Sequence, residues 1–200
     1  KYGPNRALPR GWSGQDNMKL RGILTAAALG LAMAAAGCTT GGMFTANYSS
    51  VRDAGYTLPR IPIEKIDRKY HRQKVSFQTG EKPGTIIVDT KEKFLYFVMG
   101  DGKAMRYGIG VGRDGFTWSG THHITRKAEW PGWTPPPQMR KRVPDLPAFM
   151  PGGPDNPLGA RALYIGSTLY RVHGTSEPWS IGQAVSSGCI RLTNDDVTDL

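Results

Sequence analysis

The chain has 200 residues and a mass of 21.9 kDa, which suits one domain with an extension better than two full domains. Its 26 glycines and 15 prolines indicate many turns and short elements, which argues against a coiled coil or a long-helix protein. The net charge of +10 first suggests a polyanionic partner such as nucleic acid. The cellular destination that the N-terminal residues predict argues against that partner.

The N-terminal residues carry the features of an export signal. Residues 1–17 show no periodicity, so we interpret them as an upstream extension and Met18 as the true start. A basic stretch over 18–21 precedes an uncharged segment, 23–36, that is too short to span a bilayer comfortably. Small residues then precede Cys38, and this run of residues resembles a bacterial lipoprotein box. An ordinary signal peptide that contains a cysteine is the alternative.

From this pattern we predict a lipoprotein-type signal peptide over 18–37 and lipidation of Cys38. The protein is then expected in the periplasm, attached to a membrane of the cell envelope through its lipid anchor. An exported protein does not meet chromosomal DNA, so no nucleic-acid partner is expected. The basic surface would face an envelope polyanion or simply water.

Residues 38–82 are polar and mixed in character, and they are predicted to form a tether with some local order near 61–66. After Pro83 and Gly84 the pattern changes to short apolar runs separated by turns. Strands are predicted over 85–88, 94–98 and 105–111, with turns at 89–92 and 100–102. This β-meander opens the domain that we assign to 83–200.

Three glycines alternate in the third predicted strand, at Gly108, Gly110 and Gly112. A dinucleotide-binding loop would place its last glycine one residue later and continue into a helix, and the sequence does neither. Glycines inside a strand more often allow the close approach of another chain segment or a ligand.

The second half begins with a long segment, 126–160, that is predicted to be irregular and of a length typical of functional loops. Strand character resumes at 163–165 and 170–173. Thr193 followed by Asp196 resembles a capping box, so a helix is predicted to begin at Asn194. The chain ends about two turns later, and we therefore expect the domain to continue beyond Leu200.

Cys189 is the candidate nucleophile. The sequence has two cysteines, so with Cys38 lipidated Cys189 is the sole thiol, although a disulfide with an unlipidated Cys38 is an alternative. Gly188 leaves room for a substrate backbone, and the N–H groups of Ser187, Gly188 and Cys189 could converge as an oxyanion hole. Arg191 adds positive charge that favours a thiolate and could hold a carboxylate.

His173 is the candidate partner of this thiol. A thiol with a pKa near about 8.5 is only slightly ionised at neutral pH and needs a base or an imidazolium beside it. A histidine in contact would stabilise the thiolate and then protonate a leaving amine. The carbonyl of Gly174 could orient the imidazole. A purely structural histidine at a strand end is the alternative.

These motifs resemble the L,D-transpeptidase catalytic domain of bacterial cell walls. The matching residues are His173-Gly174-Thr175, Ile181-Gly182 and Ser186-Ser187-Gly188-Cys189-Ile190-Arg191-Leu192. The hairpin predicted over 84–98, the run Trp133-Thr134-Pro135-Pro136 and the helix start at 194–197 also fit. The resemblance covers about 82–200.

The resemblance implies a mainly β fold with a sandwich-like core and small helices. Cys189 would attack the peptide bond after the third residue of a peptidoglycan stem tetrapeptide, D-Ala would leave, and a thioester would form. An acceptor amine of a stem peptide or an envelope protein would resolve the thioester, in cell-wall cross-linking or remodelling. No metal or other cofactor is implied, and carbapenems typically acylate the cysteine.

Residue by residue, the resemblance makes Cys189 the nucleophile and His173 the acid and base. The Gly174 carbonyl would orient His173, and Arg191 would line the substrate site. Ser187, Gly188 and Cys189 would form the oxyanion hole. Many members have His at the position of Ser187, and Ser is also common there.

Three other functions remain open. A Cys–His amide hydrolase, similar to an L,D-carboxypeptidase, would use the same nucleophile with water as acceptor. A non-catalytic peptidoglycan-binding lipoprotein would have an inert Cys189. A metal site built from His122, His123, His173 and Cys189 is disfavoured, because adjacent histidines on a strand point to opposite faces.

Overall fold

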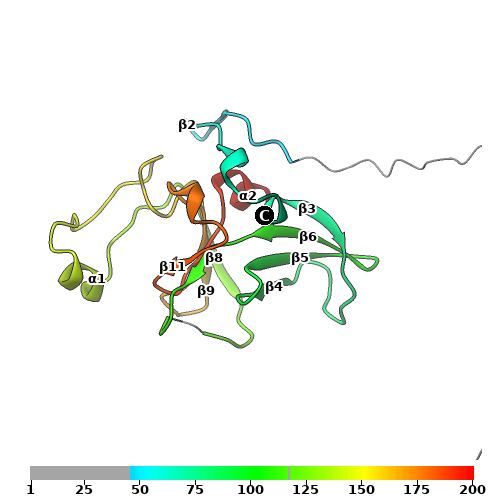
Figure 1. The fold of residues 1–200 in the computed structure, drawn as a ribbon. Coiled ribbons are helices and arrows are strands. Elements are labelled where there is room, and N and C mark those ends of the chain that lie inside the picture. Colours follow the sequence, from blue (N-terminus) through cyan, green and yellow to red (C-terminus); the bar gives the residue numbers. More distant parts are fainter. Residues whose placement is uncertain (1–45, 117) are drawn as a thin grey trace, which may run out of the picture. The chain divides into compact units, whose positions relative to one another are not determined.

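The computed structural model describes residues 46–116 and 118–200, and short strands predominate in them (Figure 1). The helices are few and short: α1 covers Pro137–Arg142 and α2 covers Asn194–Asp199, and single 3-10 turns form η1 (Ile63–Lys65), η2 (Arg68–Tyr70) and η3 (Pro178–Ser180). The mainly β class with small helices is therefore confirmed. The predicted upstream extension over 1–17, the signal peptide over 18–37 and Cys38 lie outside the described residues.

The first sheet is antiparallel and contains the predicted meander. Its strands lie in the order β3 (Gln73–Ser76), β6 (Lys103–Gly108), β5 (Phe94–Gly100) and β4 (Ile86–Asp89). The turn between β4 and β5 is closed by the Glu92 N–H, which donates to the Asp89 carboxylate at 2.9 Å. The strands predicted at 85–88 and 94–98 are confirmed.

The second sheet comes from the second half of the chain. Its strands lie in the order β12 (Ile190–Arg191), β10 (Arg171–His173), β9 (Arg161–Ile165) and β8 (Ile124–Glu129). β10 is parallel to β12 and antiparallel to β9. A further short parallel pair, β7 (Val111–Gly112) with β11 (Ala184–Ser186), lies beside it through the bridge between Gly110 and Arg191.

Both sheets contribute to one apolar core, as a sandwich-like domain requires. Leu95 and Tyr107 from the first sheet pack with Leu163, Val172 and Ile190 from the second. Fully burying a side chain of this size stabilises a fold by roughly 1.5–3 kcal/mol. The α2 helix closes this core with Val197, and the predicted helix start is confirmed because the Thr193 side chain accepts from the Asp196 N–H at 3.1 Å.

The structure corrects the predicted tether over 38–82 in the part that it describes, residues 46–82, where the order extends well beyond 61–66. These residues form β1 (Val51–Asp53), β2 (Tyr56–Leu58), η1, η2 and β3, and β3 is a strand of the first sheet. Two side-chain contacts fix the segment to α2. The Tyr48 hydroxyl donates to Asp196 at 3.4 Å, and the Arg72 guanidinium pairs with Asp199 at 2.7 Å.

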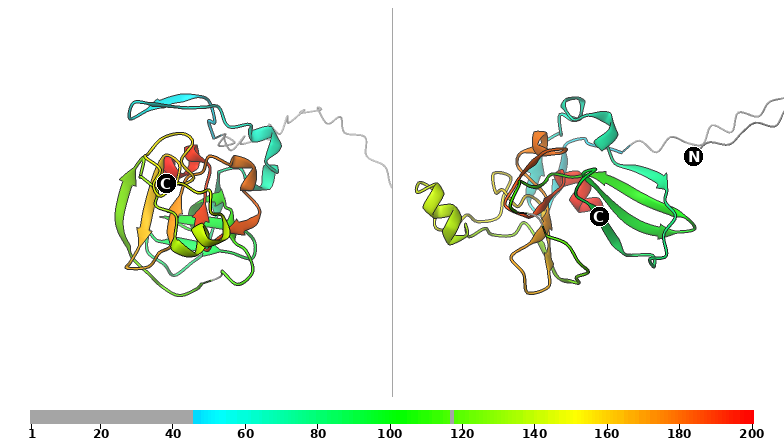
Figure 2. Two further views of the ribbon diagram at one scale, coloured as in Figure 1. Left: turned by 90° about the vertical axis from the view of Figure 1, so that its left-hand side faces the viewer. Right: turned by 60° about the horizontal axis from the view of Figure 1, so that its bottom comes forward.

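The prediction of an irregular segment over 126–160 is wrong at two places. Residues 124–129 form β8, which pairs along β9, and residues 137–142 form α1. β8 is an edge strand and is largely exposed, so its residues have no apolar alternation that would reveal a strand. Figure 2 shows α1 on a loop that stands away from the sheets.

The three alternating glycines lie where other chain segments approach closely. A Cβ at Gly108 would collide with the backbone of Tyr70, and one at Gly110 would lie 2.8 Å from the carbonyl oxygen of Ser180. The prediction of one continuous strand over 105–111 is wrong at its end. β6 ends at Gly108 and β7 begins at Val111.

Within residues 46–116 and 118–200, no helix is both long enough and apolar enough to cross a membrane.

Replacing Gly108 by Ala tests the packing of η2 against β6. Because the added methyl group would meet main-chain atoms of Tyr70, Gly108→Ala should lower the free energy of unfolding by about 1–3 kcal/mol. Gly80 has open space around it, so Gly80→Ala should change stability by less than about 0.5 kcal/mol. Urea denaturation measures both. Equal stability of the two variants would show that Tyr70 does not lie against β6.

Candidate active site

The parallel pairing of β10 with β12 assembles the candidate site. Val172 lies opposite Ile190, and His173 lies opposite Arg191. Because side chains alternate across a strand, Val172 and Ile190 point together into the core. The residues that follow, His173 and Arg191, therefore point together to the other face of the sheet. Extending the same register back by one residue from Val172 and Ile190 places Arg171 beside Cys189.

A cleft of about 320 Å³ lies over this second face. The sheet contributes Cys189, Arg191, His173 and Arg171 to it, and the loops around it contribute both polar and apolar side chains. These further lining residues include Trp133, Gln138, Met139 and Arg142 around α1, and Leu169, Tyr170, Ser186 and Ser187 near the thiol.

Cys189 is a free, partly exposed thiol at this cleft. Its Sγ lies 3.9 Å from the carbonyl oxygen of Leu169, a distance at which a thiol can donate weakly. Cys189 is itself partly exposed and lines the cleft, so this contact leaves the thiol accessible.

His173 is buried beneath the cleft and neutral. Its Nδ1 lies 2.5 Å from the Gly174 carbonyl oxygen, and since a carbonyl can only accept, Nδ1 carries the proton and Nε2 is free to accept one. The pKa of His173 is lowered to about 3, chiefly by burial and to a smaller extent by the nearby charges of Arg191 and Arg171, against the opposing effect of the Gly174 hydrogen bond. The ring is therefore held in its neutral form, with Nε2 available to accept a proton.

The Gly174 carbonyl is itself held in place from α2. The Oδ1 atom of Asn194 accepts from the Thr175 N–H at 3.2 Å and from the Ala160 N–H at 2.9 Å. A Cβ at Gly174 would collide with that same oxygen atom. The first residue of α2 thus fixes the backbone that orients the imidazole.

The loop before Cys189 is organised by Ser186, a residue of the matched motif whose own role could not be inferred from the sequence. Its hydroxyl accepts from the Gly188 N–H at 3.1 Å and donates to the Cys189 carbonyl at 2.6 Å. The Gly188 N–H of the predicted oxyanion hole is thus engaged within the loop. The N–H groups of Ser187 and Cys189 are the two remaining members.

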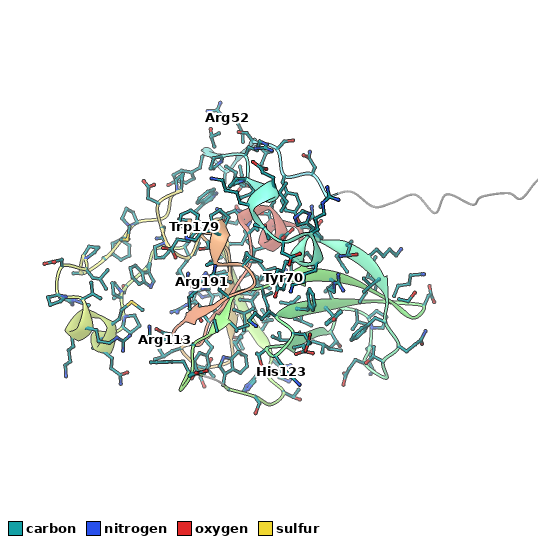
Figure 3. All side chains as sticks on the ribbon, viewed as in Figure 1. Arg52, Tyr70, Arg113, His123, Trp179 and Arg191 are labelled. Carbon is teal, nitrogen blue, oxygen red and sulfur yellow. The ribbon has the colours of Figure 1, made fainter. Side chains whose placement is uncertain are left out.

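Two arginines supply the positive charge of the cleft. Arg191, labelled in Figure 3, is 18% exposed and donates to the Glu177 carboxylate at 2.8 Å. Arg171 donates to the Leu169 carbonyl at 3.0 Å and lies over the Tyr164 ring. Arg171 was not among the predicted site residues, although its position two residues before His173 on a strand already indicates the same face.

His122 and His123, the other two histidines of the metal site considered from the sequence, do not line the cleft. The His122 ring contacts Trp118 edge-on at a centroid distance of 5.3 Å, and His123 is exposed and is labelled apart from Arg191 in Figure 3. Within residues 46–116 and 118–200, no group of three or more His, Cys, Asp or Glu side chains is arranged to hold a metal ion. Cys38, the predicted lipidation site, is outside these residues.

Comparison with known proteins places the arrangement in a family. The family model described as the L,D-transpeptidase catalytic domain (YkuD) matches residues 83–200. The chain belongs to the L,D-transpeptidase catalytic domain family. The match contains both strands of the candidate site and every residue that the resemblance assigned to it.

Individual members of the family show how far the similarity extends. The chain is 46% identical over 121 residues to the probable L,D-transpeptidase ErfK/SrfK of Escherichia coli K12, which is 56% of this chain and 38% of that protein. A Fuscovulum blasticum protein, named as an L,D-transpeptidase in the ATP synthase subunits region, is 34% identical over 88% of both chains. The chain therefore spans less than half the length of the E. coli relative.

A solved structure also resembles the chain. A Brucella melitensis protein, described as a probable carnitine operon oxidoreductase, has 45% sequence identity and a TM-score of 0.50. The likeness covers 69% of this chain and 90% of that one. Its description names an activity different from that of the curated L,D-transpeptidase relatives.

The protonation of His173 can be measured directly. Because its pKa is lowered to about 3, the ring should stay neutral from about pH 8 down to about pH 5. Arg191→Gln removes one cation that disfavours imidazolium, so the pKa of His173 should rise while burial keeps it below the ordinary value. NMR titration of the imidazole shifts measures both effects.

Arg60→Gln is the matched control, because Arg60 pairs with Glu64 on the exposed surface. It should leave the His173 titration unchanged. A His173 ring that titrates with a pKa of about 6.5 in the unaltered protein would contradict the burial of this residue.

Proposed function

We propose that the chain is a cysteine-dependent L,D-transpeptidase that acts on stem tetrapeptides of peptidoglycan. The observation that carries the proposal is a neutral, buried His173 on the same sheet face as Cys189, with Nδ1 hydrogen-bonded to Gly174. A neutral imidazole with a free Nε2 is the form that can take a proton from a thiol. Membership of the family supports the same function.

In the first half-reaction, His173 Nε2 accepts the Cys189 proton while the sulfur forms a bond to the carbonyl carbon of the third stem residue. The carbonyl oxygen becomes an oxyanion, which accepts from the N–H groups of Ser187 and Cys189. Collapse of this intermediate breaks the C–N bond. The imidazolium returns its proton to the departing nitrogen, D-Ala leaves, and a thioester remains.

In the second half-reaction, an acceptor amine attacks the thioester carbon. His173 removes a proton from the attacking nitrogen and delivers it to the departing sulfur, which regenerates the thiol. The acceptor would belong to another stem peptide or to an envelope protein, which gives cross-linking or remodelling of the wall. The low pKa of His173 favours the donating step of this relay, because the imidazolium gives up its proton readily, whereas the accepting step relies on the negative charge that develops on the substrate oxygen.

The charges of the cleft support an anionic substrate. Arg191 and Arg171 line the cleft beside the thiol, where a planar guanidinium can hold a carboxylate through two parallel hydrogen bonds. A stem tetrapeptide presents the terminal carboxylate of D-Ala close to the bond that is cut. We therefore assign to these arginines the binding of substrate carboxylates.

We also propose that a lipid on Cys38 anchors the protein in the periplasm, as the signal-like pattern over 18–37 indicates. Residues 38–45 would then connect the anchor to the catalytic unit. Membrane fractionation of a Cys38→Ser variant tests this placement. The variant should appear in the soluble periplasmic fraction, and its retention in membranes would contradict the lipid anchor.

Intact-protein mass spectrometry after mixing with a carbapenem tests the proposed nucleophile. The unaltered protein should gain one covalent adduct, and Cys189→Ser should gain none. His173→Gln should keep the thiol but form the adduct at least about 100-fold more slowly, because its base is lost. An adduct on Cys189→Ser, or an unchanged rate in His173→Gln, would contradict the assigned roles.

A further inference from the structure

Trp118 donates a hydrogen bond to the loop that carries the nucleophile. Its indole Nε1–H lies 2.6 Å from the carbonyl oxygen of Gly188. Trp118 lies in the segment between β7 and β8 and is outside the set of residues that line the cleft. Trp118 therefore contacts the loop that carries the nucleophile without lining the cleft itself.

The acceptor of this bond belongs to the same peptide unit as a proposed oxyanion donor. The carbonyl of Gly188 and the N–H of Cys189 share one planar amide, and in a trans peptide the two groups point in opposite directions. A donor that fixes the carbonyl on one side therefore fixes the direction of the N–H on the other. It also polarises the amide, which strengthens the N–H as a donor.

An aromatic stack holds this peptide in position. The Trp118 ring stacks on Tyr170 with a centroid distance of 5.0 Å and an interplanar angle of 7°. Tyr170 in turn lies against Gly188, because a Cβ there would be 2.5 Å from its ring. Gly188 has a φ of +102°, a conformation that side-chain-bearing residues rarely adopt. The loop thus depends on glycine and on the two rings beneath it.

A second hydrogen bond ties the same segment to the start of the loop. The Arg113 N–H donates to the Ser186 carbonyl at 3.1 Å, two residues before the Gly188 carbonyl that Trp118 contacts. The segment after β7 therefore contacts both ends of the short turn that leads into Cys189. Rotation of the Gly188–Cys189 peptide would break the Trp118 bond and leave a carbonyl without its donor.

We propose that Trp118 is a positioning residue, whose indole N–H directs the Cys189 N–H toward the carbonyl oxygen of the substrate. This inference rests on the proposed function, since it concerns the oxyanion hole of the same reaction. Trp118 does not touch the substrate. It acts through the backbone of the nucleophile loop.

The test compares two reactions of Cys189 in the full chain. Acylation by a carbapenem passes through an oxyanion, whereas alkylation by iodoacetamide displaces iodide and needs no oxyanion hole. Trp118→Phe keeps an aromatic ring but removes the N–H. It should slow carbapenem acylation at least about tenfold, since the loss of an oxyanion donor itself costs about 100-fold or more. Alkylation of Cys189 should keep its rate within about twofold.

Trp130 offers a matched control. Its indole N–H also donates to an acceptor, the Asp53 carboxylate at 2.9 Å, and its ring also contacts a tyrosine, Tyr56. Trp130→Phe therefore removes the same kind of hydrogen bond at a place outside the cleft. Both reactions of Cys189 should proceed in this variant as in the unaltered protein.

The outcomes separate the inference from the proposed function. Equal acylation rates in Trp118→Phe and the unaltered protein would overturn the role of Trp118, and so would an equal loss of both reactions in a folded variant. An unaltered protein that is alkylated but never acylated would instead contradict the proposed function. If Trp118→Phe does not fold, 3-benzothienylalanine at position 118 keeps the ring shape without the N–H, and the same selective loss of acylation is expected.

Discussion

The site depends on one parallel pair of short strands. β10 and β12 pair over two residues each, yet this pairing decides which side chains face the cleft. Val172 and Ile190 anchor the two strands in the apolar core, and a shift of one residue would bury the polar face and expose the apolar one. The burial of two aliphatic side chains therefore fixes the placement of the thiol and the imidazole.

The chemistry proposed for this face depends on a balance of opposing effects on His173. The Gly174 carbonyl favours a protonated ring, whereas burial and two arginines disfavour it, and burial dominates. The imidazolium that forms when His173 takes the proton of the thiol is therefore short-lived unless negative charge develops nearby. In the proposed mechanism the oxyanion provides that charge, so the orientation of the Cys189 N–H and the basicity of His173 act on the same step.

The sequence predicted the local features of the fold and site. The hairpin strands were visible because apolar runs alternate with turn residues, and the cluster around Cys189 was visible as a motif. The ordered segment over 46–82 was not, because Tyr48 and its partner Asp196 are 148 residues apart. β8 was missed because an exposed edge strand has no apolar pattern. The bond from Ser186 to the Gly188 N–H depends on a turn that no spacing rule predicts.

The central claim is that Cys189 and His173 transfer an acyl group from a stem tetrapeptide to an amine. Its most direct test is product analysis by mass spectrometry after incubation with a peptidoglycan tetrapeptide and an excess of a D-amino acid other than D-Ala. We expect the D-amino acid to replace D-Ala in the presence of the unaltered protein, and no exchange with Cys189→Ala. Formation of the hydrolysed tripeptide alone, or the same exchange with Cys189→Ala, would contradict the account.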